Sequence, residues 1–405
     1  IIICIYKKYY LSLHHHFNRN NMIRNLIGPP VTGTDFIGRE KELADAWKAL
    51  EDTNSLLLAS PRRVGKSSFA MKLANKAEEK GWNALYLDLQ GLKDEGEFIS
   101  LIIKKLNKIK EKNSIFELAK NRIQDFLSSI KKVNAFKITL ELQKNPEDFY
   151  EKLSKAFELP QRTLIIIDEL VLFLQELSRN GEIARAETFL NWLRNIRQKQ
   201  SENVSWVFCS SISIHGFVSQ NKLTYTINDI APFNLGEMTK EEATLLFEEL
   251  DESYETELSK EDIDYILGRI GWKLPYFIQL FFNKLTGNKE SYQKMSLEDC
   301  VNKIFQEIIQ EHELDTWSER LTTYGEDETA SRKLLCYLCL PDHKNERNFL
   351  EEIIKDFVPE NTDINEKYAN IKRMLETDGY IVHDTSGIHF RSPIIREYWF
   401  NRYIQ

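Results

Sequence analysis

Three consecutive residues have the types and the order that bind a phosphate group. Gly65, Lys66 and Ser67 follow the short apolar run Ser55–Ala59 and precede the helical pattern Ser68–Gly81. Glycine lets the backbone curl so that successive N–H groups point at one anion. Lysine spans the β- and γ-phosphates, and the serine hydroxyl is a ligand for Mg²⁺. A strand, a loop and a helix in this order form the context that a phosphate-binding P-loop requires.

The loop departs from the usual P-loop pattern at one position. In the pattern G-x-x-x-x-G-K-S/T, Ser60 stands where the first glycine belongs. Two arginines, Arg62 and Arg63, lie inside the loop and are expected to contact phosphate or another domain. The loop residues expected to bind the nucleotide are Ser60, Pro61, Arg62, Arg63, Val64, Gly65, Lys66, Ser67 and Ser68.

A second chemical signal is a pair of acids at the end of an apolar run. Thr163–Ile167 is continuously apolar after its first residue, as in a central parallel strand that is buried on both faces, and Asp168 and Glu169 follow it. Asp168 is expected to hold a water bound to Mg²⁺, and Glu169 to polarise the attacking water as the catalytic base. Lys66 completes the predicted catalytic set. The alternative is a core strand that ends in two solvated acids.

These residues need a parallel sheet to bring them together. Further strands are predicted over Asn83–Gln90, Val204–Ser211 and Thr224–Asn228, and helical segments alternate with them. In such sheets the ligand lies at the carboxyl ends of the strands. Ser210 or Ser211 could therefore act there as a polar sensor of the γ-phosphate or of the attacking water. The alternative, that these serines only close a strand, stays open.

Several segments in order resemble a known family. Thr34–Leu43 is similar to the h-x-G-R-E-x-E-L box that precedes the P-loop in many prokaryotic regulatory ATPases. Together with the loop, the strand IIIDE and Gly271–Tyr276, it makes the chain from about Pro29 onward resemble the archaeal-type ATPase group of the STAND and AAA+ P-loop NTPases, relatives of the origin-recognition ATPases. The resemblance implies an α/β fold with a parallel sheet, followed by a helical lid and a C-terminal winged-helix domain.

The resemblance also implies ligands and further site residues. ATP or ADP with Mg²⁺ would be bound, and Phe36, Ile37 and Gly38 would line the adenine pocket. Pro275 would lie near the nucleotide. In AAA+ relatives, an arginine near the place of Arg194 and Arg197 can reach a neighbour's γ-phosphate. Two solvated arginines on an amphipathic helix are the favoured interpretation here.

The domain division follows from these motifs and from changes in pattern along the chain. Residues 1–21 are expected to be a non-native or mis-started tail, because the first methionine is Met22 and the apolar opening lacks the pattern of a signal peptide. The three consecutive histidines His14–His16 cannot all face one ion, so no metal site is expected there. The predicted parts of the chain are the tail, an ATPase domain over 22–236 with a mainly helical insertion at about 93–160, a lid over 237–320 and a winged helix over 321–405.

A winged helix often indicates DNA binding, but the charges here argue against it. Residues 321–405 carry 11 basic and 15 acidic side chains, a net charge of −4. The expected recognition helix opens with Asp363, where residues that read bases would lie. Cys336 and Cys339 lie inside an apolar helix and are expected to be core residues, not a zinc or redox site. A protein partner or self-association is favoured over DNA.

Composition limits the remaining function classes. The 405 residues carry 54 basic and 62 acidic side chains, so the chain does not coat DNA by charge alone. No run of about 18 uncharged apolar residues indicates a membrane span, and five scattered cysteines are typical of a cytoplasmic protein. The sequence predicts an ATPase that acts as a nucleotide-controlled switch. A DNA-binding initiator or regulator that uses ATP, and a nucleotide-bound scaffold without turnover, stay open as alternatives.

Overall fold

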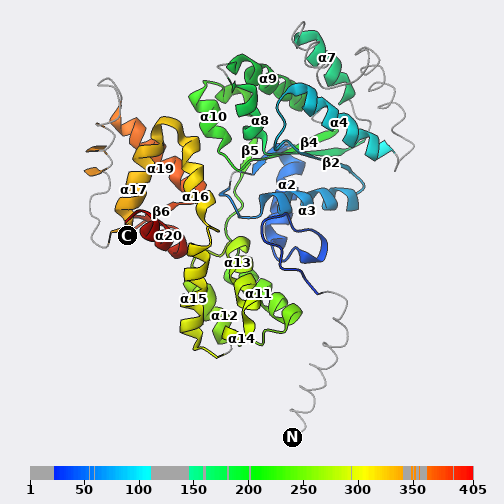
Figure 1. Ribbon diagram of the computed structural model, residues 1–405. Coiled ribbons are helices and arrows are strands. Elements are labelled where there is room, and N and C mark those ends of the chain that lie inside the picture. The colour runs from blue at the N-terminus through cyan, green and yellow to red at the C-terminus, as the bar shows by residue number, and fades with distance from the viewer. Residues whose placement is uncertain are drawn as a thin grey trace, which may run out of the picture. The chain divides into compact units, whose positions relative to one another are not determined.

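The protein is described here from a computed structural model, in which the described chain divides into two compact units (Figure 1). The sheet unit comprises Glu40–Arg62 and Lys66–Gly236. The helical unit comprises the chain up to Arg39, Arg63–Gly65 and Glu237–Gln405. The structure describes residues 22–53, 55–58, 60–110, 146–157, 161–179, 182–199, 202–292, 294–340, 348–349, 351–352, 355, 363–385 and 387–404. The three-domain division that the sequence indicates stays a prediction.

A five-stranded sheet of parallel pairs forms the centre of the sheet unit. Its order is β2-β3-β4-β1-β5, so β4 lies between the strand before the loop and the strand that ends in acids. The strands β1, β2, β3 and β4 begin where the sequence predicts them. Their bounds, with that of the edge strand, are β1 (Ser55–Leu58), β2 (Asn83–Asp88), β3 (Thr163–Asp168), β4 (Val204–Cys209) and β5 (Ala231–Phe233).

Helices pack against both faces of this sheet. On one face, α2 contacts β1 and α3 contacts β2. On the other face, α4 contacts β2 and α9 contacts β4. Because side chains alternate along a strand, each strand supplies residues to both layers. The helices of the unit are α2 (Glu40–Thr53), α3 (Lys66–Glu79), α4 (Glu95–Lys110), α7 (Pro146–Ala156), α8 (Leu170–Leu177), α9 (Ile183–Lys199) and α10 (Ile214–Gln220).

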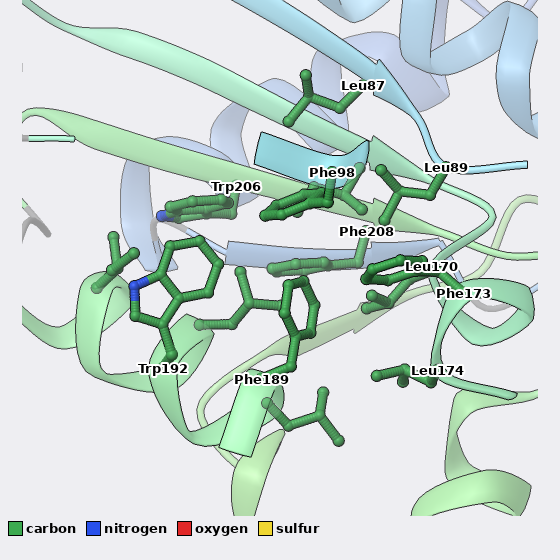
Figure 2. Close-up of a cluster of buried hydrophobic side chains, with 14 of the residues drawn as sticks. Leu87, Leu89, Phe98, Leu170, Phe173, Leu174, Phe189, Trp192, Trp206 and Phe208 are labelled. Atoms are coloured by element: carbon green, nitrogen blue, oxygen red, sulfur yellow. The ribbon is translucent and has the colours of Figure 1, made fainter. Parts of the chain in front are cut away.

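The layer under α4, α8 and α9 is an aromatic core (Figure 2). Trp206 and Phe208 of β4 stack with their rings 2° from parallel and their centroids 5.9 Å apart. Phe98 of α4 meets Phe189 edge-on at 5.0 Å, and Phe173 of α8 lies 5.8 Å from Phe98. Burying one such ring contributes about 1.5–3 kcal/mol. This core therefore supports one face of the sheet, and a separate set of buried apolar residues, among them Phe69 and Leu73 of α3, packs on the other face.

The fifth strand corrects one sequence prediction. The sequence predicts a strand over Thr224–Asn228, but Thr224–Thr226 is the 3-10 helix η4, and the strand that pairs with β1 is β5 (Ala231–Phe233). The Thr226 hydroxyl donates to the carbonyl of Leu223 at 2.7 Å. The threonines thus close a turn through local hydrogen bonds, which compete with the strand that their β-branched shape favours.

The first part of the helical unit is a series of capped helices. Thr239 and Ser259 form capping boxes with Glu242 and Asp262 and so begin two of these helices. Ser296 caps a third helix through the N–H of Asp299 at 3.1 Å. The helices are α11 (Lys240–Tyr254), α12 (Lys260–Ile270), α13 (Pro275–Gly287), α14 (Lys289–Tyr292), α15 (Leu297–Gln310) and α16 (Asp315–Arg320), and they lead into the 3-10 helix η5 (Leu321–Asp327).

The C-terminal part contains an antiparallel strand pair with helices around it. The strands β6 (Ile381–Asp384) and β7 (Gly387–Phe390) pair antiparallel. Helix α19 begins after Asp363, whose carboxylate accepts hydrogen bonds from the N–H groups of Asn365 and Glu366. Asp363 therefore serves as a helix cap. The helices around the pair are α17 (Glu328–Cys339), α19 (Ile364–Asp378) and α20 (Pro393–Tyr403).

Some predictions lie outside the described residues. They concern the tail 1–21, the middle of the insertion at 111–145 and most of the stretch 341–362 of the predicted winged helix. Within the described part, Cys339 is buried and Cys336 is half-buried, and no cluster of three metal-binding side chains is present. None of the helices described has the length and apolar character needed to cross a membrane.

We expect Gly271→Ala to lower the free energy of unfolding by about 1–3 kcal/mol. Gly271 ends α12 with φ +71°, and an added Cβ would lie 2.7 Å from Cδ of Pro393, the first residue of α20. Urea denaturation checks this. Gly268→Ala, inside α12 with nothing within 4 Å of the new Cβ, is the control and should not destabilise. Equal stability of the two variants would contradict the expectation.

Candidate functional site

A buried lysine organises the loop that follows β1. Lys66 is 7% exposed, and its ammonium donates to the carbonyls of Ser60 and Pro61 at 2.8 Å each. The loop thus curls around this ammonium. Gly65, with φ +94°, makes the last turn before α3 begins at Lys66. A Cβ on Gly65 would meet no protein atom within 4 Å, so this side of the loop has room for a ligand.

Ser60, the position where the chain departs from the P-loop pattern, has a structural role. Its hydroxyl accepts a hydrogen bond from the N–H of Leu235 at 2.7 Å and lies 3.5 Å from Oδ1 of Asn234. The serine therefore ties the start of the loop to the segment that follows β5.

The two acids after β3 have different environments. Asp168 is 4% exposed, and its Oδ1 accepts from the N–H of Glu169 at 3.0 Å. Glu169 is half-buried and left-handed, with φ 56° and ψ 36°. Its Oε2 accepts from the N–H and the hydroxyl of Ser211 at 3.0 and 2.8 Å. Glu169 and Ser211, both predicted as catalytic, are thus directly hydrogen-bonded.

A buried thiol shows how closely the predicted charges gather. Burial raises the pKa of the Cys209 thiol, the negative charges of Asp168 and Glu169 raise it further, and the positive charge of Lys66 opposes them. All three charged groups therefore act on one atom at the end of β4. Ser210 is occupied elsewhere, because its hydroxyl accepts from the N–H of Ile212 at 3.3 Å. Of the two sensor candidates, Ser211 is the one that contacts an acid.

Tyr86 belongs to this group of residues, and the sequence analysis missed it. Its hydroxyl donates to Oδ2 of Asp168 at 2.5 Å and shares a side-chain hydrogen bond with Ser67. Burial raises the pKa of Tyr86, and the charge of Asp168 raises it further, so the phenol stays neutral. The alternation in the segment Asn83–Asp88 was the available signal, since it places Tyr86 on one sheet face.

In the helical unit, the predicted G-R-E box is held by a helix cap. Arg39, at φ 70°, donates its backbone N–H to Oε1 of Glu242 at 2.5 Å. The Arg39 guanidinium is buried and donates to the carbonyls of Glu237 and Val64 at 3.2 and 3.4 Å. The sequence analysis did not assign Arg39 a role. The half-buried Phe36, Ile37 and Gly38 directly precede it.

Arg63 of the loop also packs within the helical unit. Its guanidinium lies over the ring of Tyr276, 4.3 Å from the centroid. Tyr276 follows Pro275, which opens α13 at its first turn. This stacking is a cation–π contact, worth about 0.5–2 kcal/mol depending on how far the pair is desolvated. The predicted roles of Arg63 and Pro275 toward a nucleotide stay predictions.

The two arginines on α9 differ from the expected solvated pair. Arg197 is 4% exposed, bonds both carboxylate oxygens of Asp229 at 2.8 and 3.1 Å, and donates to the carbonyl of Thr226. It is an internal tie that fixes the segment before β5, so the solvated interpretation is wrong for Arg197. Arg194 is half-buried, with its Nε buried and without a hydrogen-bond partner.

The donor set fits a magnesium nucleotide. Mg²⁺ prefers hard oxygen ligands, takes few from the protein and keeps several waters. Ser67 and Asp168 supply such oxygens through hydroxyl and carboxylate groups. The Lys66 ammonium at the head of α3 supplies positive charge for phosphate, together with the N–H groups of the first helical turn. These residues can therefore hold a phosphate and its metal ion.

Comparison with known proteins supports the fold. The structure is similar to a Walker-type ATPase of Pyrococcus abyssi, with a TM-score of 0.61, 17% identity, and coverage of 93% of this chain and 99% of that one. It is also similar to the ORC2 protein of Aeropyrum pernix solved as ADPNP–ADP complexes, with a TM-score of 0.50, 15% identity, and coverage of 95% and 97%. At these identities the likeness concerns the fold alone, and it confirms the predicted α/β fold with a parallel sheet.

The sequence comparisons give no family. A scan against models of protein families finds no match. A search of curated proteins finds no match either.

Ser60→Gly, which restores the usual P-loop pattern, should destabilise the protein by about 1–3 kcal/mol, because the buried N–H of Leu235 loses its acceptor. Guanidinium denaturation is the measurement. Ser100→Ala is the control, since the Ser100 hydroxyl only donates to the carbonyl of Gly96 within α4. A Ser60→Gly protein as stable as the wild type would rule out the structural role of this serine.

Proposed function

We propose that this chain is an ATP-binding, Mg²⁺-dependent ATPase that acts as a nucleotide-controlled switch in a regulatory or defence-type role. One observation carries the proposal: β4 lies between β1, which leads into the loop with Lys66, and β3, which ends in Asp168, and Ser211 just beyond β4 bonds the Glu169 carboxylate. A cation that binds phosphate, an acid suited to a metal-bound water and an acid suited to a catalytic base thus meet at the carboxyl ends of the strands.

Each residue has a defined task in this proposal. Lys66 binds the β- and γ-phosphates, and its present bonds to the carbonyls of Ser60 and Pro61 hold it at the mouth of the loop. Bound Mg²⁺ would neutralise charge on the phosphates, with Ser67 and Asp168 as the residues that hold it. The Glu169 carboxylate would orient and polarise the attacking water.

The similar structures support nucleotide binding. The Pyrococcus abyssi protein is described as a Walker-type ATPase, and the Aeropyrum pernix protein was solved with ADPNP and ADP. The adenine contacts of Phe36, Ile37 and Gly38, and the place of Pro275 near the nucleotide, belong to the same proposal. They rest on the resemblance of the G-R-E box and of Gly271–Tyr276.

The switch role rests on the loop residues that group with the helical unit. Arg63–Gly65 belong to that unit, while their neighbours Arg62 and Lys66 belong to the sheet unit. Arg63 stacks on Tyr276, and the Val64 carbonyl accepts from Arg39. A nucleotide that contacts Arg63–Gly65 would change these contacts of the loop. A protein partner or self-association would read the resulting change.

A non-hydrolysing scaffold is the second candidate, because Glu169 already has partners. Its Oε2 accepts two hydrogen bonds from Ser211, which compete with a water for the same oxygen. A DNA-binding regulator is the weaker alternative. Residues 321–405 have a net charge of −4, and Asp363 at the start of α19 caps that helix.

Two substitutions separate binding from hydrolysis. Lys66→Ala should lower ATP affinity about 100-fold, because charge-assisted bonds to phosphate are lost. Glu169→Gln should keep ATP affinity and lower turnover about 10²–10⁴-fold. Isothermal titration calorimetry gives affinity, and phosphate release gives turnover. Glu187→Gln is the matched control, since Glu187 accepts a hydroxyl hydrogen bond from Tyr225 on the surface.

The same assays distinguish the alternatives. Unchanged ATP affinity in Lys66→Ala would contradict the P-loop assignment. Tight ATP retention by the wild type without turnover would favour the scaffold. Stimulation of turnover by duplex DNA, with binding that weakens steeply as salt is raised, would favour the DNA-binding regulator.

A further inference from the structure

We propose that Tyr86 is a positioning residue of the metal site, and that its hydroxyl joins Ser67 to Asp168. This inference rests on the proposed function, because these are the two residues expected to hold Mg²⁺. Three observations support it: the register of β2 and β3, the helix that covers the same sheet face, and the direction of the hydrogen bonds. None of the sequence motifs includes Tyr86.

The register explains how a residue inside β2 reaches the end of β3. Tyr86 pairs with Ile166, and Asp88 pairs with Asp168. Paired residues of parallel strands direct their side chains to the same face, so Tyr86 and Asp168 share a face two residues apart. The long phenol ring spans this offset along the sheet and brings its hydroxyl to Oδ2 of Asp168 at 2.5 Å. A shorter side chain at position 86 could not reach that atom.

The helix that carries Ser67 covers the same face. Helix α3 begins at Lys66 and contacts both β2 and β3. Ser67 therefore lies in the first turn of α3, above the strand face that presents Tyr86. The Ser67 side chain acts to lower the pKa of Tyr86, as a hydroxyl that donates to the phenol oxygen does. One hydroxyl from β2 thus bonds a group at the end of β3 and lies under the helix that carries Ser67.

The direction of these hydrogen bonds follows from their donors and acceptors. An ionised carboxylate only accepts, so the Tyr86 proton points to Asp168. The Tyr86 oxygen is then an acceptor, and the Ser67 hydroxyl donates to it. A serine that offers a lone pair to Mg²⁺ still carries a proton, and that proton needs an acceptor. Tyr86 supplies one while it keeps Asp168 in place, where Oδ1 is already fixed by the Glu169 N–H at 3.0 Å.

The consequence concerns metal affinity more than nucleotide affinity. Mg²⁺ requires near-ideal octahedral geometry, so small shifts of either oxygen weaken its binding. Loss of a partner that orients metal ligands typically lowers metal affinity about 10–100-fold. Phosphate contacts made by Lys66 and the loop backbone do not involve Tyr86. Tyr86→Phe should therefore weaken the binding of Mg²⁺ and leave the affinity for metal-free nucleotide unchanged.

The experiment measures the affinity of the full chain for ATP in excess EDTA and then across a Mg²⁺ titration. For Tyr86→Phe, we expect the EDTA affinity to stay within about twofold of the wild type and the half-saturating Mg²⁺ concentration to rise about tenfold or more. Tyr292→Phe is the matched control, because the Tyr292 hydroxyl donates to a carboxylate, that of Glu307, at 2.8 Å in the helical unit. This control should leave both values unchanged.

A double substitution tests whether Tyr86 acts through Asp168. In an Asp168→Asn background, Tyr86→Phe should raise the half-saturating Mg²⁺ concentration by less than a further twofold, because the two residues act as one unit. The inference would be overturned if Tyr86→Phe left the half-saturating Mg²⁺ concentration unchanged, or if it lowered ATP affinity equally in EDTA. It would also be overturned if the effects of Tyr86→Phe and Asp168→Asn on that concentration were fully additive. A wild type that binds no ATP would instead overturn the proposed function, and the inference with it.

Discussion

The buried ammonium of Lys66 is the group on which the rest of the site depends. A lysine that is 7% exposed is costly unless polar groups compensate its charge. The carbonyls of Ser60 and Pro61 do so directly, and the carboxylates of Asp168 and Glu169 lie close enough to act on the same Cys209 thiol. The order of the sheet makes this possible. Because β4 lies between β1 and β3, its end at Cys209 is flanked by the loop and by the acids.

The sequence predicts the parts of the fold that depend on local pattern. The strands β1, β2, β3 and β4 are continuous or alternating apolar runs, and the capping boxes at Thr239 and Ser259 mark helix starts through side chains three residues apart. Local competition explains the failure at Thr224–Asn228. The Thr226 hydroxyl closes a turn, and the buried Arg197–Asp229 pair fixes that segment from α9, a contact 32 residues away that periodicity does not reveal.

The candidate site shows the same limit. Gly65, Lys66, Ser67, Asp168 and Glu169 were found because their types and spacing carry chemistry within single segments. Tyr86 carries no such signal, since its role depends on the pairing of β2 with β3 and on α3 covering that face. Ser60 shows the converse. Ser60 departs from the P-loop pattern, but the Ser60 hydroxyl accepts a hydrogen bond from the N–H of Leu235, which lies beyond β5.

Glu169 combines backbone strain with side-chain restraint. A left-handed residue other than glycine costs about 1–3 kcal/mol, and such conformations persist where the surroundings impose them. Here the backbone N–H of Glu169 bonds Asp168, and its carboxylate bonds the N–H and hydroxyl of Ser211. The acid is thus held from β3 on one side and from the end of β4 on the other. In the proposed reaction, the Glu169 carboxylate would have to leave Ser211 before the same oxygen could hold a water, so these hydrogen bonds couple the end of β4 to the proposed base.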